Sequence, residues 1–205
     1  MKVAITGASG LVGRFFVDWA LGAGHELRIL SRETGYQLGD CPDLEGVNLV
    51  IHSAFAHVKG RYRGGEGDDP EGFIRANLDG SVALFEGAKS SGVPRVVFLS
   101  SRAVYGDYPA GTELTEDLAP RPDTLYGEVK HGAEQALADL SDAAFIGQSL
   151  RATGVYGATG QDNKWAEMFR DLAKGINPPP RRATEVHAHD LALAVQALAQ
   201  APSGV

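Results

Sequence analysis

The N-terminal segment limits the possible folds more than any other part of the chain. Residues 3–6 form a short apolar run typical of a buried strand, and they lead directly into the glycine-rich turn TGASGLVG at residues 6–13. Apolar side chains then recur at helical spacing until Gly22 and Gly24 end the pattern. A strand that enters a helix through such a turn is the first half of a βαβ unit, so we expect an α/β fold with a parallel sheet.

The remainder of the chain continues this alternation. Strands are predicted at residues 26–30, 36–40, 49–53, 95–100 and 145–150, and helices at 70–91, 124–140, 165–174 and 190–200. Residues 36–40 follow the preceding strand too closely for a parallel crossover, which needs about ten residues or more. They form either a poor edge strand or no strand, and we favour the edge strand. The pattern as a whole predicts one Rossmann-like domain with a doubly wound parallel sheet.

The composition excludes several classes of partner. A formal net charge of −7 opposes general binding to nucleic acid or to an anionic membrane surface. The single cysteine, Cys41, cannot form an internal disulfide and fits a reducing compartment. No apolar run approaches the ~20 residues that cross a bilayer, and the first residues lack the apolar core of a signal peptide. We therefore expect a cytoplasmic protein.

The glycine turn has the chemistry of a dinucleotide site. Gly7 permits a tight turn, Gly10 allows the backbone to approach a pyrophosphate, and Gly13 allows the helix to pack closely on the sheet. The free N–H groups and the dipole at a helix N-terminus favour an anion. The contacts expected here come from Thr6, Gly7, Ser9, Gly10, Leu11, Val12 and Gly13.

The residues after the strand at 26–30 bear on which dinucleotide binds. A site for NAD usually has an acidic residue about 20 positions beyond the glycines, where it holds the ribose 2′-hydroxyl. This chain has Ser31 and Arg32 at that point. A guanidinium can hold a 2′-phosphate through paired hydrogen bonds, although Arg32 can equally be an ordinary surface residue. We expect NADP(H) to be favoured over NAD(H).

Tyr126 and Lys130 are the candidate proton-transfer pair. They lie four residues apart at the start of the predicted helix 124–140 and therefore share a face. A phenol has an ordinary pKa of ~10, and a nearby ammonium in a poorly hydrated cleft stabilises the phenolate. Tyr126 can then exchange a proton with a substrate oxygen during hydride transfer. Ser100 and Ser101 end an apolar strand at its carboxyl end, where open α/β sheets form their ligand crevice.

These motifs together resemble the extended or atypical branch of the short-chain dehydrogenase/reductase family, which includes nucleotide-sugar epimerases and dehydratases. The resemblance rests on the GxxGxxG spacing, on YGEVK at 126–130 and on FLSSRAVYG at 98–106. It implies that Ser101 bonds the reacting oxygen, with Ser100 as second choice, and that Asn77 orders a relay water near Lys130. The further cofactor contacts that it implies are Asp40, Ala54, Phe55, Ala56, Ser100, Tyr126, Lys130 and Val155.

The resemblance covers nearly the whole chain, but the part after Gly157 is compressed. It implies a cofactor half at about 1–150 and a small, shortened C-terminal substrate lobe at about 151–205. The acidic pair that follows the serine in sugar 4,6-dehydratases is replaced by Arg102 and Ala103, which disfavours dehydratase chemistry. Candidate substrate contacts are His57, Arg102, Tyr105, Asn163, Lys164 and Arg182.

The predicted function is that of an NAD(P)-dependent epimerase or oxidoreductase acting on a nucleotide sugar or a small carbonyl compound. The resemblance also implies a homodimer through helices 70–91 and 124–140. The alternative is a non-catalytic NAD(P)-binding redox sensor or scaffold. His187, His189 and Asp190 invite a metal site, but we expect none because Asp190 suits a helix N-cap. Residues 60–69 are predicted to form a loop beside the cleft, either as a lid or without order.

Overall fold

A computed structural model of the chain describes residues 1–58, 65–157, 164–180 and 183–202. Its centre is a five-stranded parallel sheet with the strand order β2-β1-β3-β4-β5. These strands are β1 (Lys2–Thr6), β2 (Glu26–Leu30), β3 (Leu49–His52), β4 (Arg95–Ser101) and β5 (Ile146–Ala152). The Rossmann-like α/β fold expected from the alternating pattern is confirmed.

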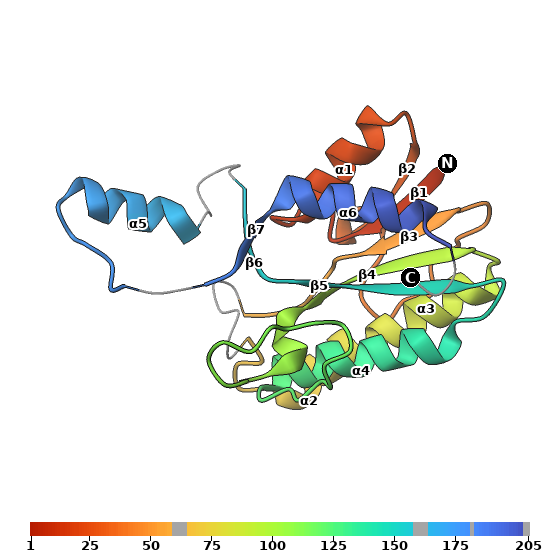
Figure 1. The fold of residues 1–205 in the computed structure, drawn as a ribbon. Coiled ribbons are helices and arrows are strands. Elements are labelled where there is room, and N and C mark those ends of the chain that lie inside the picture. The colour runs from red at the N-terminus through yellow and green to blue at the C-terminus, as the bar shows by residue number, and fades with distance from the viewer. Residues whose placement is uncertain (59–64, 158–163, 181–182, 203–205) are drawn as a thin grey trace.

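Helices cover both faces of the sheet (Figure 1). Helices α1 (Gly13–Gly22) and α6 (Ala188–Gln200) pack on one face, and α3 (Gly80–Ser90) and α4 (Leu125–Leu140) pack on the other. Successive side chains of a strand point to opposite faces, so β1 contributes to both layers of core. Val3 and Ile5 join the core under α1 and α6, whereas Ala4 joins the core under α3 and α4.

The helix predicted at 70–91 forms with one irregularity. It consists of α2 (Pro70–Ile74), a π-helical turn η2 (Arg75–Asp79) and α3. Asp69 caps its start, because its side chain accepts a hydrogen bond from the Gly72 amide at 2.8 Å. The π-helical turn contains the buried Asn77. Such turns occur often at functional sites.

The prediction of an edge strand at residues 36–40 is wrong, because these residues form no strand. The chain instead leaves β2 through a short helical turn, η1 (Arg32–Thr34), and reverses at Gly35, whose φ is 84°. The amide of Tyr36 then donates to the Ser31 carbonyl at 2.8 Å, and the Tyr36 side chain is buried in the core. The link after β2 is too short for a parallel crossover, so a loop covers the sheet edge where a strand was expected.

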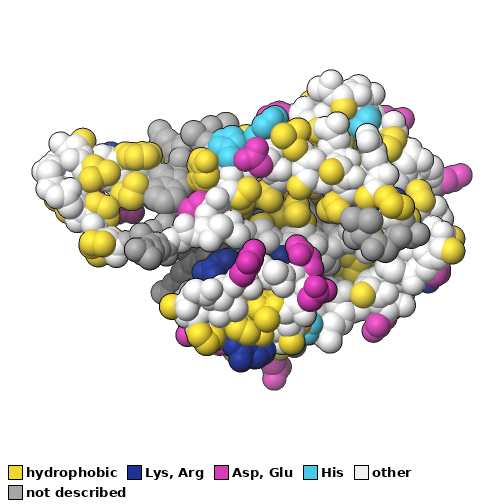
Figure 2. All heavy atoms as spheres, in the orientation of Figure 1, with side chains coloured by type: hydrophobic (Ala, Val, Ile, Leu, Met, Phe, Trp, Pro, Cys, Tyr) yellow, Lys and Arg dark blue, Asp and Glu magenta, His cyan; other side chains and the backbone are white. Residues whose placement is uncertain are grey.

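The C-terminal portion has two parts. Strand β6 (Gly154–Tyr156) pairs in parallel with β7 (Glu185–His187), and α5 (Lys164–Ala173) projects away from the sheet (Figure 1). Hydrophobic side chains lie exposed around this projecting segment (Figure 2), among them Phe169, Leu172 and Ile176. Helix α6 returns to the main core.

Asp190 is not the N-cap of this last helix, contrary to expectation. Helix α6 begins at Ala188, two residues before the predicted start, and the cap is His187, whose Nδ1 accepts from the His189 amide at 3.1 Å. None of the described helices combines the length and the hydropathy needed to span a bilayer.

Candidate active site

The glycine turn is held in shape by contacts that only glycine allows. Gly7 has a φ of 71°, and a Cβ added to it would lie 2.6 Å from the Ala54 nitrogen. A Cβ on Gly13 would overlap the Gly7 carbonyl oxygen. The N-terminus of α1 has no side-chain cap and no acidic residue in its first turn. Its amide groups and dipole therefore suit an anion such as a pyrophosphate, with Ser9 and Gly10 exposed at the turn.

The segment after β3 lies directly against this turn. The hydroxyl oxygen of Thr6 accepts hydrogen bonds from the amides of Ser53 and Ala54, at 3.2 and 3.1 Å. The Ser53 hydroxyl donates to the Thr6 carbonyl at 2.7 Å. Phe55 follows, and its ring meets that of Tyr126 edge to face with centroids 5.1 Å apart. The predicted cofactor contacts on this segment thus connect the glycine turn to the predicted proton-transfer pair.

Helix α4 carries that pair on the face next to Phe55. Thr124 caps the helix by accepting from the Gly127 amide at 3.1 Å, so Tyr126 lies in the first turn. Lys130 is 4% exposed, and its Nζ donates to the Leu99 carbonyl at 2.7 Å. The same Nζ lies 4.3 Å from the Phe55 ring centroid and 6.0 Å from that of Tyr126. The spacing of the two residues predicted this shared face.

The direction of the Tyr126 pKa corrects one expectation. Burial raises the pKa of Tyr126 above its usual value, and a hydrogen bond with Ser101 acts in the opposite direction. Burial lowers the pKa of Lys130 to about 7, with Glu134 opposing the change. The low-dielectric surroundings that were expected to strengthen the pull of Lys130 on the phenolate instead favour the neutral form of both groups.

The two serines at the end of β4 have different surroundings. Ser101 lies close enough to Tyr126 to lower its pKa, and it caps the short helical turn η3 (Arg102–Tyr105) by accepting from the Ala103 amide at 3.2 Å. Ser100 is buried, and its hydroxyl has no hydrogen-bond partner among the described residues. Ser101, the first choice from the sequence, is therefore the serine that faces the tyrosine.

Asn77 faces the segment after β3 from the π-helical turn. Its Oδ1 accepts from the Ala56 amide at 2.7 Å, and its Nδ2 donates to the Ala56 and Phe73 carbonyls at 2.8 and 3.0 Å. The side-chain amide is thus directed at Ala56 rather than at Lys130. The predicted residues that lie together through these contacts are Thr6, Gly7, Ala54, Phe55, Ala56, Asn77, Ser101, Tyr126 and Lys130.

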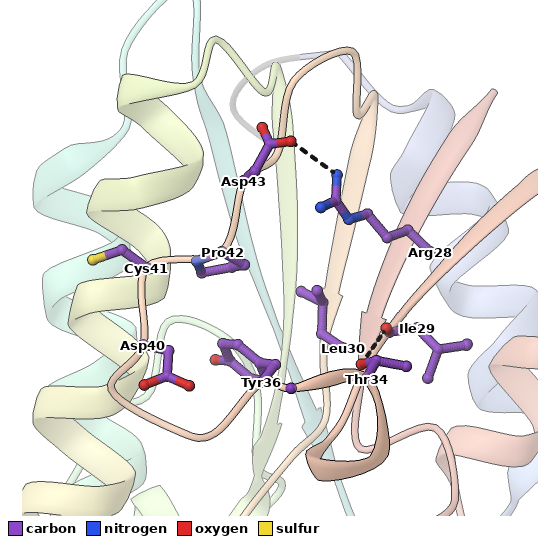
Figure 3. Close-up of a pocket in the computed structure, with 10 residues that line it drawn as sticks. Arg28, Ile29, Leu30, Thr34, Tyr36, Asp40, Cys41, Pro42 and Asp43 are labelled. Atoms are coloured by element: carbon purple, nitrogen blue, oxygen red, sulfur yellow. Dashed lines mark hydrogen bonds and ion pairs between the residues drawn. The ribbon is translucent and has the colours of Figure 1, made fainter.

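Several other predicted contacts lie apart from this group. Ser31 and the exposed Arg32 follow β2, and Asp40 lies on the loop at the outer edge of that strand, where its carboxylate accepts from the Gln37 amide at 2.6 Å. This loop encloses a cavity of about 480 Å³ with the Arg28–Asp43 ion pair on one side (Figure 3). Val155 lies on β6, half-buried.

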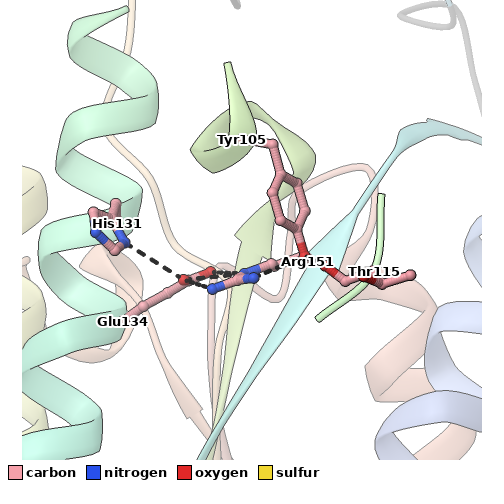
Figure 4. Close-up of polar contacts among 5 residues, drawn as sticks. All are labelled: Tyr105, Thr115, His131, Glu134 and Arg151. Carbon is pink, nitrogen blue, oxygen red and sulfur yellow. Dashed lines mark hydrogen bonds and ion pairs between the residues drawn. The ribbon is translucent and has the colours of Figure 1, made fainter. Parts of the chain in front are cut away.

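The substrate candidates are divided as well. His57 and Arg102 are exposed. Tyr105 is buried, with its hydroxyl bonded to the Thr115 carbonyl and to Arg151 (Figure 4). Arg102 and Tyr105 line a separate cavity of about 1330 Å³ between residues 106–116, β5 and α6. Asn163 and Arg182 lie outside the described residues, as do residues 60–64 of the predicted loop, and only the backbone of Lys164 is described.

The sequence reasoning missed a partly buried ion pair beside the site. Arg151 on β5 makes a two-pronged contact with Glu134 on α4, at N–O distances of 2.7 to 3.1 Å (Figure 4). Glu134 lies one helical turn beyond Lys130, a spacing that marks it as a neighbour on the same face. Within the described ranges, no cluster of three or more His, Cys, Asp or Glu side chains is arranged to hold a metal.

Comparisons with known proteins agree with this architecture. The model of the NAD dependent epimerase/dehydratase family matches residues 3–204. UDP-glucose 4-epimerase of Corynebacterium glutamicum is 29% identical over 187 residues, which cover 84% of this chain and 56% of that protein. Human sterol-4-alpha-carboxylate 3-dehydrogenase, decarboxylating, is 27% identical over 174 residues, covering 76% and 45%. The chain spans about half the length of these relatives.

Solved structures give the same result. MoeE5 in complex with UDP-glucose and NAD superposes with a TM-score of 0.80 at 26% identity, over 98% of this chain and 72% of that one. The UDP-glucose 4-epimerase of Thermus thermophilus in complex with NAD has a TM-score of 0.80 at 26% identity, over 99% and 76%. The predicted resemblance is confirmed, and the chain belongs to the NAD-dependent epimerase/dehydratase family.

Proposed function

We propose that this chain catalyses hydride transfer between a nicotinamide dinucleotide and a carbinol or carbonyl carbon, with Tyr126 as the acid/base group. The observation that carries the proposal is the continuous series of contacts from the glycine turn through Phe55 to Tyr126. A dinucleotide whose pyrophosphate lies at α1 can extend along this series toward the tyrosine. The substrate is a nucleotide sugar, as in MoeE5, or a smaller carbonyl compound.

Each residue has a defined part in the proposed chemistry. The bound dinucleotide supplies or accepts the hydride. The Tyr126 phenol donates a proton to the substrate oxygen, or removes one, and the Ser101 hydroxyl, which faces the phenol, hydrogen-bonds the same substrate oxygen. Lys130 supports the phenol from the buried side, where its Nζ is fixed by the Leu99 carbonyl.

We infer a preference for NADP(H) from Arg32. The residue is exposed at the start of the turn that follows β2, where a guanidinium can reach a ribose 2′-phosphate. Both neighbours described above were solved with NAD, so the preference rests on this arginine alone. Comparable dissociation constants for NADP⁺ and NAD⁺ would contradict it.

The experiment that tests the proposed function uses the protein as purified. Mass measurement identifies any bound dinucleotide, and turnover is then measured on a panel of nucleotide sugars, ketones and aldehydes. Bound NAD⁺ without consumption of free NADPH indicates an epimerase, and steady NADPH consumption indicates a reductase. The Tyr126→Phe variant should lose turnover and keep dinucleotide affinity.

Two outcomes would count against the proposal. Unchanged turnover in Tyr126→Phe would remove the tyrosine from the chemistry. Tight dinucleotide binding with no turnover across the panel would favour the non-catalytic sensor. A homodimer through α2–α3 and α4, a cytoplasmic location and a substrate lobe over residues 151–205 remain predictions, and sedimentation of the purified chain tests the first of these.

A further inference from the structure

A closed network of buried hydrogen bonds lies beneath the proposed site, and the proposed chemistry makes no use of it. Its centre is His52 at the end of β3, which is 0% exposed. One ring nitrogen, Nδ1, lies 2.7 Å from the Thr6 hydroxyl, and the other, Nε2, lies 2.9 Å from the Ser81 hydroxyl. The Ser81 hydroxyl donates in turn to the main-chain carbonyl of Asn77.

This hydrogen-bond network closes through the segment that carries Phe55. Asn77 holds the amide and the carbonyl of Ala56, while Thr6 holds the amide of Ala54. Phe55 is therefore clamped on both sides. His52 and Ser81 join the two clamps, so a change in either one loosens the relation between the glycine turn and the π-helical turn.

The directions of these bonds define the tautomer of His52. The Ser81 proton is directed at a carbonyl, so the Ser81 oxygen must accept a proton from Nε2. At the other end the Thr6 oxygen already accepts two amide protons, so its own proton is directed at Nδ1. Both ends require a neutral imidazole with its proton on Nε2.

We propose that His52 and Ser81 are positioning residues that hold Phe55 against Tyr126 and Lys130, with His52 as the neutral Nε2–H tautomer. The Phe55 ring contacts both members of the pair, at 5.1 Å from the Tyr126 centroid and 4.3 Å from Lys130 Nζ. A displaced Phe55 would uncover the ammonium and alter the approach of the phenol. The effect on turnover rests on the proposed function, whereas the tautomer does not.

The electrostatic surroundings of His52 agree with a neutral ring. The His52 ring stacks on Phe98, with ring centroids 5.5 Å apart, and meets Phe85 edge to face, with centroids 5.6 Å apart. The charged group that acts on it is Lys130, whose Nζ lies on the Phe98 ring at 4.6 Å. Burial and this ammonium lower the pKa of His52 to about 3. The ring should therefore stay uncharged at neutral pH.

The first test is a nitrogen NMR spectrum of the full chain labelled at histidine. One imidazole should show the Nε2–H pattern, stay neutral from about pH 5 to pH 8 around the ordinary histidine pKa, and shift in the Ser81→Ala variant. The histidine whose signal shifts in Ser81→Ala is thereby identified as His52. If that histidine is charged at pH 7, or carries its proton on Nδ1, the proposal is overturned. This result does not depend on catalysis.

The second test compares variants of α3. Ser81→Ala leaves a buried Nε2–H without its acceptor, so turnover should fall roughly tenfold while the dinucleotide dissociation constant changes by less than about twofold. Ser81→Thr keeps the hydroxyl and should restore turnover. Ser90→Ala is the matched control, because Ser90 on the same helix makes a similar bond to Gly87 on the exposed side.

Turnover equal to wild type in Ser81→Ala, with Tyr126→Phe inactive, would refute the positioning role and leave the proposed function standing. Should the wild-type chain show no turnover, the contact between the rings of Phe55 and Tyr126, measured by nuclear Overhauser effect, decides the question. A contact weakened in Ser81→Ala and kept in Ser90→Ala supports the proposal. An unchanged contact in both variants overturns it.

Discussion

Replacing Glu134 with glutamine tests how strongly the ion pair with Arg151 ties α4 to the sheet. The pair has N–O distances of 2.7, 3.0 and 3.1 Å, and the side chains are 7% exposed for Glu134 and 24% for Arg151. Removing one member of a buried pair costs about 3–5 kcal/mol. Because Arg151 keeps some contact with water and glutamine keeps one acceptor, we expect a loss of about 2 kcal/mol in the free energy of unfolding.

The assay is urea unfolding at neutral pH, with the slope compared between variants so that a change in midpoint reports stability. Glu71→Gln is the control, because its pair with Arg75 is 3.6 Å long and its members are 88% and 64% exposed. That change should cost less than about 0.5 kcal/mol. A Glu134→Gln loss equal to the Glu71→Gln loss would refute the reasoning, as would full additivity with Arg151→Met in a double-mutant cycle.

Three further predictions follow from single features of the structure. The pKa of Lys130 is about 7 in the folded protein and lies near its usual value in the unfolded chain. At pH values between these two pKa values the unfolded state binds one more proton than the folded state, so the free energy of unfolding should rise between about pH 7 and pH 9, by at most ~1.4 kcal/mol per pH unit. Lys130→Met should flatten that slope in urea titrations. Gly13→Ala should abolish dinucleotide binding in calorimetry because its Cβ overlaps the Gly7 carbonyl, whereas Gly22→Ala, with open space around it, should bind normally. Arg32→Ala should weaken NADP⁺ binding about tenfold and leave NAD⁺ binding unchanged; equal losses for both would contradict the assigned role.

The sequence predicted the sheet because its signals are local. Buried runs such as residues 95–101 and the strand–turn–helix at the N-terminus identify elements from the order of residues alone. An edge strand at residues 36–40 was favoured although the link after residue 30 is too short for a parallel crossover, and the length of that link was the better guide. The burial of Tyr36 depends instead on the core between the sheet and helices α3 and α4, to which Leu44 and Val47 also belong.

The residues of the candidate site also fall into those that the sequence could predict and those that it could not. Tyr126 and Lys130 were predictable, because a four-residue spacing on a helix fixes a shared face. His52, Ser81 and Glu134 were not, since their partners lie many positions away in the chain and become neighbours only in the packed structure. A buried polar residue within an apolar strand, as His52 is in residues 49–52, is the one local signal that could have identified this network.

The pKa directions of the central pair make the chemistry asymmetric. Burial keeps the Tyr126 phenol protonated at neutral pH, so under the proposed function it is ready to donate a proton to a carbonyl oxygen that gains a hydride. To act as a base, Tyr126 needs a positive charge close by, and Lys130 is only partly charged near pH 7. The remaining source is the positive ring of an oxidised nicotinamide. The pKa of Tyr126, measured by absorbance titration against Tyr126→Phe, should therefore be lower with the oxidised dinucleotide than with the reduced one; equal values would show that Tyr126 does not sense the cofactor.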